Sequence, residues 1–399
     1  MKKAKKYRCL TITAVSIFKE KNMNCKYQNI CGGCPLRNTD QSVYRQSKLE
    51  HFKKIVFHLH QKQIAFGEPF FAQDGQRRRA EMAFKYKKGR IILGFNAEQS
   101  HELIDIESCP ALLSDINKIM PQIRIFLLNI CILKTTRKIK NKYITDSISQ
   151  GEIHITSAAN GIDILLEINE KITMEHRMEI CNFANSNPQI IRISVGPKNT
   201  KPETIIEKIK PCISIAGRQV FIPAGTFLQA SVAGEKALIA AVLKYIGSTA
   251  GNIADLFCGV GTFSYPLAQN IKNKITAIDS SDELLDSFQK TINFLTIPNI
   301  KIEKKNLFKY PLNADELKKF AAIVFDPPRA GAAAQVLQIA TAPYEDKPLK
   351  IVAVSCNPHT FINDANCLLD SGYKLTEIIM VDQFVYSRHF ELVAMFEKA

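Results

Sequence analysis

Reactive side chains stand directly after short apolar runs in the last third of the chain. Cys356 follows residues 351–355, a run of β-branched and small residues that predicts a buried strand. Asp279 and Asp326 end two further runs of this kind. Ligands of an open parallel α/β sheet bind outside the carboxyl ends of its strands. We therefore expect these side chains to face one crevice, where a cysteine could act as a nucleophile, although a lone cysteine is more often a buried core residue.

Two nearby features indicate a nucleotide-like ligand. Gly259 and Gly261 lie between a predicted strand and a predicted helix, where a backbone without side chains can approach a ligand closely. Ser264 occupies the position at which a dinucleotide fingerprint needs a third glycine or an alanine. Asp279, after the next strand, suits two vicinal ribose hydroxyls. The pattern allows either a nicotinamide nucleotide or S-adenosylmethionine.

Two acidic residues extend this group. Asp326 begins the sequence Asp-Pro-Pro-Arg, and its two prolines fix a turn that would project the carboxylate into the crevice; the alternative is a simple turn with a solvated acid. Glu391 lies at a position where a polar residue interrupts the last predicted strand. Buried acids of this kind are commonly functional or paired.

The N-terminal region contains a group of cysteines with the spacing of metal ligands. Cys25, Cys31 and Cys34 lie within ten residues, and two glycines separate the last two. Cys109, which also precedes a proline, is the candidate for a fourth ligand. Four thiolates fit zinc or an iron–sulfur cluster, and a redox pair of Cys31 and Cys34 is the alternative. The odd total of eleven cysteines argues against a disulfide framework and favours a cytoplasmic protein.

Hydrophobic periodicity divides the chain into regions. Strands alternate with helices after residue 217, which predicts a doubly wound α/β domain, and residues 111–216 read as an α+β module. A helix is expected over residues 41–61, and a hairpin rich in cations over residues 77–95. The predicted regions are a basic extension (1–24), a cysteine-ligated region with the basic hairpin (25–110), a central module (111–216) and the C-terminal domain (217–399).

The charge distribution favours a polyanionic partner. The net charge is +15, but residues 1–150 hold 28 Lys and Arg against 12 Asp and Glu, whereas the remainder is nearly neutral. A basic first third on a neutral protein indicates a surface for nucleic acid. RNA phosphate is one candidate for the arginines at 77–79; a solvated charged face is the other. A membrane is not expected, because no apolar run reaches transmembrane length.

Taken together and in this order, the motifs resemble the bacterial RNA (uracil-5-)methyltransferases that use S-adenosylmethionine. The resemblance runs from Cys25 to the C-terminus. It covers the cysteine block, Phe227-x-Gln229, residues 255–261, Asp-Pro-Pro-Arg at 326–329, Ser-Cys-Asn-Pro at 355–358 and His389-x-Glu391. It implies a Rossmann-like class I methyltransferase domain, and the cysteine block resembles that of the 23S ribosomal RNA enzymes, since the tRNA branch generally lacks it.

The resemblance also implies a role for each motif residue. Cys356 would be the nucleophile that adds to C6 of uracil, and Glu391 would remove the C5 proton. The target base would have to leave its helix or loop to reach the thiol. The four cysteines would hold a [4Fe–4S] cluster. The positions that would contact the methyl donor are Gln229, Phe257, Thr262, Asp279, Asn306 and Asp326.

Four features depart from the family pattern. Residues 1–24 are too short for the N-terminal β-barrel module that some relatives carry. Thr262 replaces a frequent Asn, Asp279 replaces the usual Glu, and Asn306 replaces an Asp expected near the adenine. These exchanges change contacts to the donor and leave the nucleophile and the base in place.

We therefore predict a monomeric cytoplasmic enzyme that methylates a uridine of 23S rRNA. The first alternative is a tRNA uridine methyltransferase. The second is a non-catalytic RNA-binding factor that keeps the methyltransferase fold. A redox protein built on the four cysteines is a third alternative, but it would have no use for Cys356 and Glu391.

Overall fold

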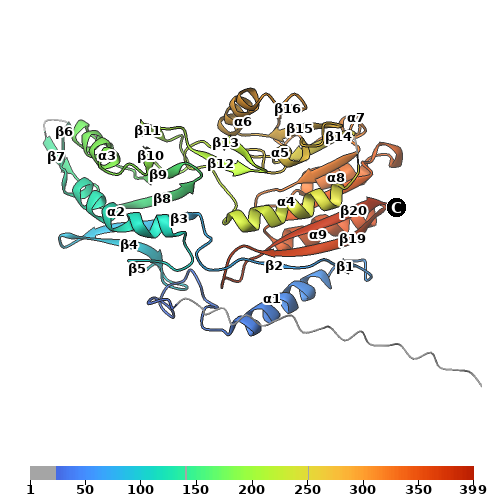
Figure 1. Cartoon of the computed structure of the whole chain (residues 1–399), viewed down its shortest axis with the longest axis horizontal. Coiled ribbons are helices and arrows are strands. Elements are labelled where there is room, and N and C mark those ends of the chain that lie inside the picture. The colour runs from blue at the N-terminus through green and yellow to red at the C-terminus, as the bar shows by residue number, and fades with distance from the viewer. Residues whose placement is uncertain (1–23, 140–141, 250) are drawn as a thin grey trace, which may run out of the picture.

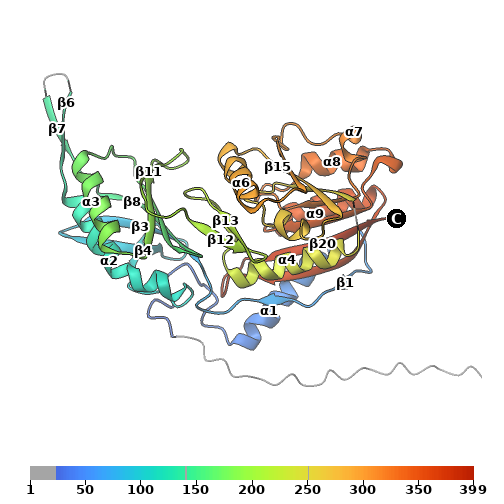
Figure 2. The same cartoon turned by 45° about the horizontal axis from the view of Figure 1, so that its top comes forward.

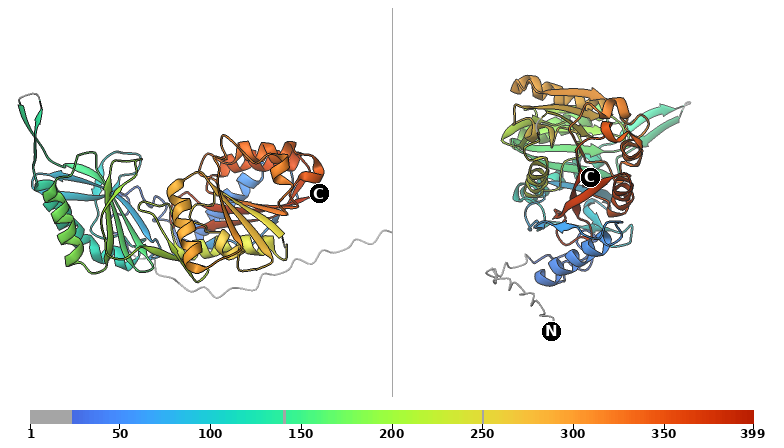
Figure 3. Two further views of the ribbon diagram at one scale, coloured as in Figure 1. Left: turned by 90° about the horizontal axis from the view of Figure 1, so that it is seen from above. Right: turned by 90° about the vertical axis from the view of Figure 1, so that its right-hand side faces the viewer.

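A computed structural model describes residues 24–139, 142–249 and 251–399 as two lobes, each built on one large β-sheet (Figure 1). Apart from Asn24, the predicted N-terminal extension lies outside the described residues. No helix of the described chain has the length and apolar character needed to span a bilayer. Figure 3 shows the two lobes side by side.

The C-terminal lobe is the predicted doubly wound α/β domain. Its main sheet has the order β16-β15-β14-β17-β18-β20-β19, and only β20 runs antiparallel to its neighbours. The chain order reverses on either side of β14, which places the ligand crevice there. The strands are β14 (Gly251–Leu256), β15 (Asn273–Asp279), β16 (Ile300–Lys304), β17 (Ala322–Phe325), β18 (Lys350–Ser355), β19 (Tyr373–Asp382) and β20 (Glu391–Lys398).

Helices cover both faces of this sheet, so its strands are apolar on both sides. Within β18, Val352 and Val354 pack into the core on one face, whereas Ile351 and Ala353 pack into the core on the other. The helices of the first face are α4 (Val232–Ile246), α5 (Ser264–Leu267) and α6 (Asp282–Leu295). Those of the second are α7 (Ala314–Leu317), α8 (Ala333–Thr341) and α9 (Pro358–Asp370), and a short 3₁₀ turn, η1 (Tyr344–Asp346), follows α8.

The other lobe has a seven-stranded sheet of order β11-β10-β9-β8-β3-β4-β5. Its helices α2 (Ser114–Ile132) and α3 (Met174–Ser186) share a core with one face of this sheet. The strands are β3 (Arg79–Lys87), β4 (Arg90–Asn96), β5 (Leu103–Asp105), β8 (Gln150–Ala158), β9 (Gly161–Glu167), β10 (Ile190–Gly196) and β11 (Glu203–Glu207). The predicted hairpin is β3–β4. The expected boundary at residue 110 runs through this sheet, because strands from both sides of it pair.

Two two-stranded ribbons lie outside the two large sheets. β6 (Thr135–Ile139) and β7 (Lys142–Asp146) form a hairpin that extends beyond α3 (Figure 2). β12 (Cys212–Ile215) and β13 (Arg218–Phe221) pair at the junction between the lobes.

The predicted region 25–110 is not one spatial unit. Its helix α1 (Gln41–Val56) ends five residues before the expected limit and packs against the second face of the C-terminal lobe. β1 (Ala65–Phe66) and β2 (Phe70–Phe71) then pair with β19 and extend the C-terminal sheet to nine strands. Sequence patterning could not show this, because two-residue strands carry no periodic signal.

A buried ion pair attaches α1 to the end of β19. The Lys48 ammonium donates to Asp382 Oδ1 at 2.6 Å and to the carbonyl oxygen of His389, and both ionic side chains are almost inaccessible to solvent. The Tyr44 hydroxyl donates to the other oxygen of Asp382. Because charges buried this deeply require their partners, α1 is an integral part of the C-terminal lobe.

The arginine run at 77–79 has a structural role that the sequence reading did not anticipate. Arg78 is fully buried and pairs with Glu235 of α4, and its Nε donates to the carbonyl oxygen of Gln229 at 2.9 Å. This cation therefore joins the two lobes and is not available to RNA phosphate. Arg79 is also largely buried and pairs with Glu81 at 2.7 Å.

Replacing Lys48 with methionine is expected to destabilise the protein by about 3–5 kcal/mol, because the Asp382 carboxylate would remain buried without its cation. Urea unfolding of the Lys48→Met variant measures this. Lys54→Met, on the exposed side of the same helix, is the matched control and should change stability by no more than about 0.5 kcal/mol. Equal effects of the two substitutions would show that the pair does not hold α1 in place.

Candidate active site

A cavity of about 450 Å³ opens at the carboxyl ends of the central strands of the C-terminal sheet. Its volume lies in the range of small-molecule sites. Both predicted catalytic residues and five of the six predicted donor-contacting residues line it. They are Cys356 and Glu391, with Gln229, Phe257, Thr262, Asp279 and Asp326. Residues far apart in the sequence thus meet at the crevice where parallel strands end.

The glycine turn after β14 forms one wall of the cavity. Gly261 has a φ of +94°, and a Cβ atom there would stand 2.5 Å from the ring of Phe288 and 2.8 Å from that of Tyr265. Gly259 has a φ of +56°, and nothing lies within 4 Å of its hypothetical Cβ. Phe257, a non-glycine residue, also has a positive φ, of 59°. Left-handed backbone of this kind concentrates at ligand sites, where it brings the chain close to a bound group.

Asp279 at the end of β15 is fixed by backbone donors. Its Oδ1 accepts N–H bonds from Ser280 at 2.7 Å and Ser281 at 3.0 Å, and its Oδ2 accepts one from Gly259 at 3.0 Å. A carboxylate offers about four lone-pair positions, so roughly one remains for a ligand hydroxyl. The acid therefore ties the second strand end to the glycine turn.

Asp326 and Glu391 are two buried acids that share the cavity. Burial raises the pKa of Asp326 to about 7. Burial, together with the nearby Asp326, raises the pKa of Glu391 to about 8. Glu391 Oε2 is buried and has no hydrogen-bond partner among the described residues. Near neutral pH each acid can therefore hold or release a proton, which suits proton transfer.

Cys356 lies just beyond β18 and is partly exposed to the cavity. Burial raises the pKa of its thiol to about 11, and the charges of Glu391 and Asp326 act in the same direction, whereas Arg329 opposes them. The thiol is consequently protonated at neutral pH in this ligand-free arrangement. A positive charge bound nearby would favour the thiolate.

A buried amide that sequence reasoning missed connects the two acids. Gln383, directly after β19, donates from Nε2 to Gln229 Oε1 at 2.5 Å and to Glu391 Oε1 at 3.1 Å. Gln229 in turn donates to Asp326 Oδ2 at 3.2 Å. One feature of the sequence could have indicated Gln383. The polar pair Asp382-Gln383 follows the apolar residues of β19, as Asp279 and Asp326 follow the apolar residues of their own strands.

Asn306 is the predicted donor-contacting residue that does not line the cavity. Its Oδ1 accepts N–H bonds from Phe308 at 3.1 Å and Lys309 at 3.2 Å, so it caps the turn after β16. Phe308 does line the cavity, and its ring lies 5.4 Å from that of Phe257. In this structure Asn306 acts on the cavity wall through the turn that it holds.

The structure brings the predicted metal-ligating cysteines into one neighbourhood. Cys109, in the loop before α2, is close enough to Cys34 and Cys25 for their charges to raise the pKa of its thiol, although burial is the larger cause; the resulting pKa is about 11. Burial, together with the charges of Cys34 and Cys25, also raises the pKa of Cys31. The Gly33 N–H donates to the Cys31 sulfur at 3.4 Å. Without a bound cation these thiols would be neutral, so the donor set fits a metal centre that ionises them.

The cysteine loop contacts the segment that leads to Glu391. The Leu36 N–H donates to the Tyr386 carbonyl oxygen at 2.9 Å. The guanidinium of Arg37 lies 4.5 Å from the centre of the Tyr386 ring and pairs with Asp74 at 2.6 Å. The loop between β19 and β20 is therefore supported by the cysteine loop as well as by α1.

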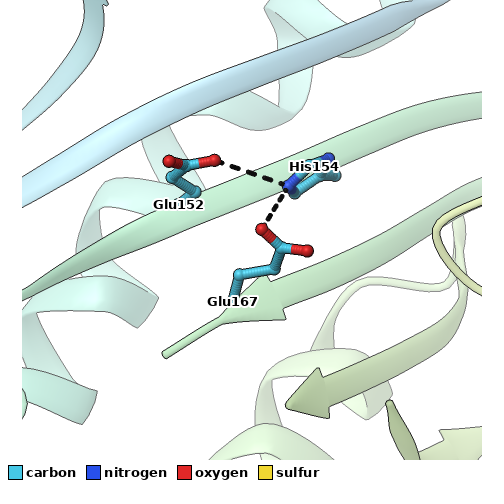
Figure 4. A group of neighbouring side chains, drawn as sticks. All are labelled: Glu152, His154 and Glu167. Atoms are coloured by element: carbon cyan, nitrogen blue, oxygen red, sulfur yellow. Dashed lines mark ion pairs between the residues drawn. The ribbon is translucent and has the colours of Figure 1, made fainter. Parts of the chain in front are cut away.

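A second group of titratable side chains lies outside the cavity, on the seven-stranded sheet (Figure 4). His154 Nε2 lies 3.2 Å from Glu167 and 3.9 Å from Glu152, and Glu81 approaches Nδ1. Both oxygens of Glu152 accept from the ammonium of Lys198, at 2.8 and 2.9 Å. Because the Lys198 ammonium already pairs with one of these acids, we interpret the group as an ion-pair cluster.

Sequence comparisons relate the chain to RNA methyltransferases. The family model described as tRNA (Uracil-5-)-methyltransferase matches residues 42–399. A protein of Agrobacterium fabrum named as an uncharacterized RNA methyltransferase is 32% identical over 92% of this chain and 82% of its own length. The 23S rRNA (uracil(1939)-C(5))-methyltransferase RlmD of Shewanella piezotolerans is 27% identical over 94% of this chain and 81% of its own.

A comparison with solved structures supports the fold. The crystal structure of Pyrococcus abyssi tRNA (uracil-54, C5)-methyltransferase in complex with S-adenosyl-L-homocysteine superposes with a TM-score of 0.67 at 19% identity. The match covers 91% of this chain and 85% of that one. The prediction of a Rossmann-like α/β methyltransferase domain is thereby confirmed.

The raised pKa of Cys356 predicts how its alkylation depends on pH. At pH 7 about one thiol in ten thousand should be ionised, so the rate with iodoacetamide should rise about tenfold per pH unit from pH 7 to pH 10. Peptide mapping by mass spectrometry resolves this cysteine from the others. Arg329→Leu should slow the reaction further, because the cation that favours the thiolate is lost. A rate that levels off below pH 9 would contradict the assignment.

Proposed function

This chain belongs to the tRNA (uracil-5-)-methyltransferase family, and from that premise we propose that it methylates C5 of a uridine in 23S rRNA through a covalent intermediate. It is an S-adenosylmethionine-dependent RNA (uracil-5-)methyltransferase. The observation that carries the proposal is the meeting of Cys356, Asp326 and Glu391 in one cavity with the glycine turn. A thiol and two acids of raised pKa are the groups that this chemistry requires.

The nucleophile is Cys356. Uracil C5 is too weak a nucleophile to take up a methyl group directly. Addition of the thiolate to C6 forms a carbon–sulfur bond and moves an electron pair through the ring to the C4 carbonyl oxygen, which gives an enolate. C5 then forms a bond to the methyl carbon of the donor, and the bond between this carbon and the sulfonium sulfur breaks, which releases the donor as a neutral thioether.

The proton acceptor is Glu391. After methylation C5 carries both a hydrogen and a methyl group, and the carboxylate takes the hydrogen as a proton. The electron pair of the C5–H bond forms the C5–C6 double bond, and the carbon–sulfur bond breaks to release the Cys356 thiolate. A pKa of about 8 lies close to an operating pH near neutrality, and such proton transfer contributes about 10²–10⁴-fold to the rate.

The methyl donor would occupy the part of the cavity beside the glycine turn. Gly259 leaves the space that backbone contacts to the donor need, and Asp279 retains acceptor capacity for a ribose hydroxyl. Asp326 and Gln229 lie between this part and Cys356, so we assign them to the junction between donor and uracil. Phe257 and Thr262 line the same wall.

We propose a [4Fe–4S] cluster on Cys25, Cys31, Cys34 and Cys109. A cluster needs four thiolates, and these four cysteines lie in one neighbourhood from which they could supply them. Backbone N–H donation to a ligand sulfur, as from Gly33 to Cys31, is a usual way to stabilise such a centre. When bound, the cluster would supply positive charge that ionises the thiols.

Two observations favour 23S rRNA over tRNA as the substrate. The relative at 27% identity is named as a 23S rRNA enzyme, and the cysteine block of this chain resembles that of the 23S rRNA branch. The rival substrate, tRNA, has the family description and the Pyrococcus abyssi neighbour in its favour. A non-catalytic RNA-binding factor would leave the buried acids beside Cys356 without a purpose.

The substrate proposal predicts that the wild-type protein transfers a labelled methyl group from S-adenosylmethionine to 23S rRNA that lacks 5-methyluridine, and leaves tRNA unlabelled. Cys356→Ala should reduce transfer to background, because Cys258, the one other cysteine of the described chain that lines the cavity, is fully buried and its pKa is raised well above the ordinary value. Labelling of tRNA with 23S rRNA unchanged would reverse the choice of substrate. Full activity of Cys356→Ala would exclude the covalent route.

The cluster proposal predicts about four iron atoms and four sulfides per chain after anaerobic purification, with visible absorbance. Cys109→Ser should lose most of the iron. Cys181→Ser, on α3 and outside the cysteine group, is the matched control and should retain it. One equivalent of zinc in a colourless protein would contradict the cluster.

A further inference from the structure

Gln383 occupies an unusual place in the described chain. It follows the last residue of β19, its side chain is buried, and it contacts both halves of the cavity. Its Nε2 donates to Gln229 on the donor side and to Glu391 on the nucleophile side. A buried amide is retained only where its polar atoms are satisfied, and here each of its contacts is to the active site or to the backbone beside it.

The direction of this amide is fixed by one backbone group. The Ala230 N–H donates to Gln383 Oε1 at 2.9 Å, so the oxygen must face Ala230 and the NH₂ group must face the two acceptors. Gln229 then accepts at its oxygen, which leaves its own NH₂ group to donate to Asp326 at 3.2 Å. One main-chain donor therefore orients two amides, and each amide donates to one carboxylate.

This arrangement distinguishes the two oxygens of Glu391. Oε1 accepts from Gln383, whereas Oε2 is buried and has no partner in the described chain. The unpartnered oxygen retains its capacity to take up a proton. The hydrogen bond to Oε1 restricts rotation of the carboxylate and so determines where Oε2 stands.

A neighbouring glycine preserves the space for Gln383. Gly234 lies in the first turn of α4, and a Cβ there would stand 2.6 Å from Gln383 Cβ and 3.0 Å from its Oε1. Glycine in a helix is usually less stable than alanine by roughly 0.5–1 kcal/mol. The close approach of Gln383 gives a physical reason for glycine at this position.

We propose that Gln383 is a positioning residue for proton removal: its amide fixes the orientation of the Glu391 carboxylate that takes the C5 proton, and through Gln229 it holds Asp326 in line. This role rests on the proposed function. Glu391 faces two other titratable groups, Asp326 and Cys356, and the charge of Asp326 disfavours its ionised form. Gln383 is the hydrogen-bond donor that favours the carboxylate.

The variant Gln383→Met tests the role, because methionine has a similar length and cannot donate a hydrogen bond. Thiolate addition and methyl transfer precede proton removal, so the variant should accumulate methylated RNA covalently bound to Cys356, visible as a shifted band on a denaturing gel. We expect kcat to fall roughly 10²-fold with KM changed less than about threefold. The rising limb of the pH–rate profile should move to higher pH, because the carboxylate loses a donor that lowers its pKa.

Gln335→Met is the matched control for the loss of a buried amide. Gln335 of α8 is equally buried and bonds the backbone of Leu312 at both its oxygen and its nitrogen, away from the cavity. The Gln335→Met variant should lower the unfolding temperature without shifting the rising limb of the pH–rate profile and without accumulating RNA covalently bound to Cys356. Gly234→Ala provides a second variant that keeps every hydrogen-bonding group but displaces Gln383, and it should show a smaller version of the Gln383→Met phenotype.

The outcomes separate this role from the proposed function. If the wild-type protein shows no Cys356-dependent transfer, the proposed function fails and the role of Gln383 fails with it. If the wild type is active and a folded Gln383→Met retains its kcat and pH limb and traps no RNA, the role of Gln383 alone is overturned. Equal pH shifts in Gln383→Met and Gln335→Met would likewise show a merely structural effect.

Discussion

The active site depends on burying two carboxyl groups and a thiol around one cavity. Burial raises the pKa of all three groups, so Asp326 and Glu391 can hold protons near neutral pH, where exposed carboxyl groups would be ionised, and the Cys356 thiol stays protonated to higher pH than an exposed thiol. A bound sulfonium brings a positive charge into the same space and favours ionisation of the neighbouring groups. In the proposed reaction this positive charge would favour the Cys356 thiolate, which would couple ionisation of the thiol to donor binding.

The sheet makes this cavity possible by bringing strand ends together. The chain order reverses around β14, so the loops after β14, β15, β17 and β18 open onto one crevice. Apolar packing on both faces fixes the strands, and each polar residue placed directly after a strand must then lie at the same edge. The scaffold is rigid where the chemistry requires fixed distances.

The segment between β19 and β20 is held by parts of the chain that lie more than three hundred residues earlier. Lys48 binds Asp382 at its start, and the backbone of Leu36 binds Tyr386 in its middle. Within the segment, Gln383 donates a hydrogen bond to Glu391. The cysteine loop and α1 therefore contribute to the placement of Glu391. Arg78, paired with Glu235, holds the second lobe against the helix that follows Gln229. We therefore expect loss of the cysteine loop to displace Glu391, which follows this segment.

The sequence by itself determined the strand–helix alternation, the glycine turn and the polar residues at strand ends, because these are local patterns with a fixed period. These patterns indicated Cys356, Asp279, Asp326 and Glu391, and the resemblance to a known family added Gln229, Phe257 and Thr262; all seven line one cavity. Only the tertiary structure decided that Arg78 is buried in an ion pair, that Asn306 caps a turn, and that Gln383 joins two acids. The physical reason is that the burial and the hydrogen-bond partners of a side chain depend on segments distant in the chain. A local sequence pattern does not identify which distant segment packs against it.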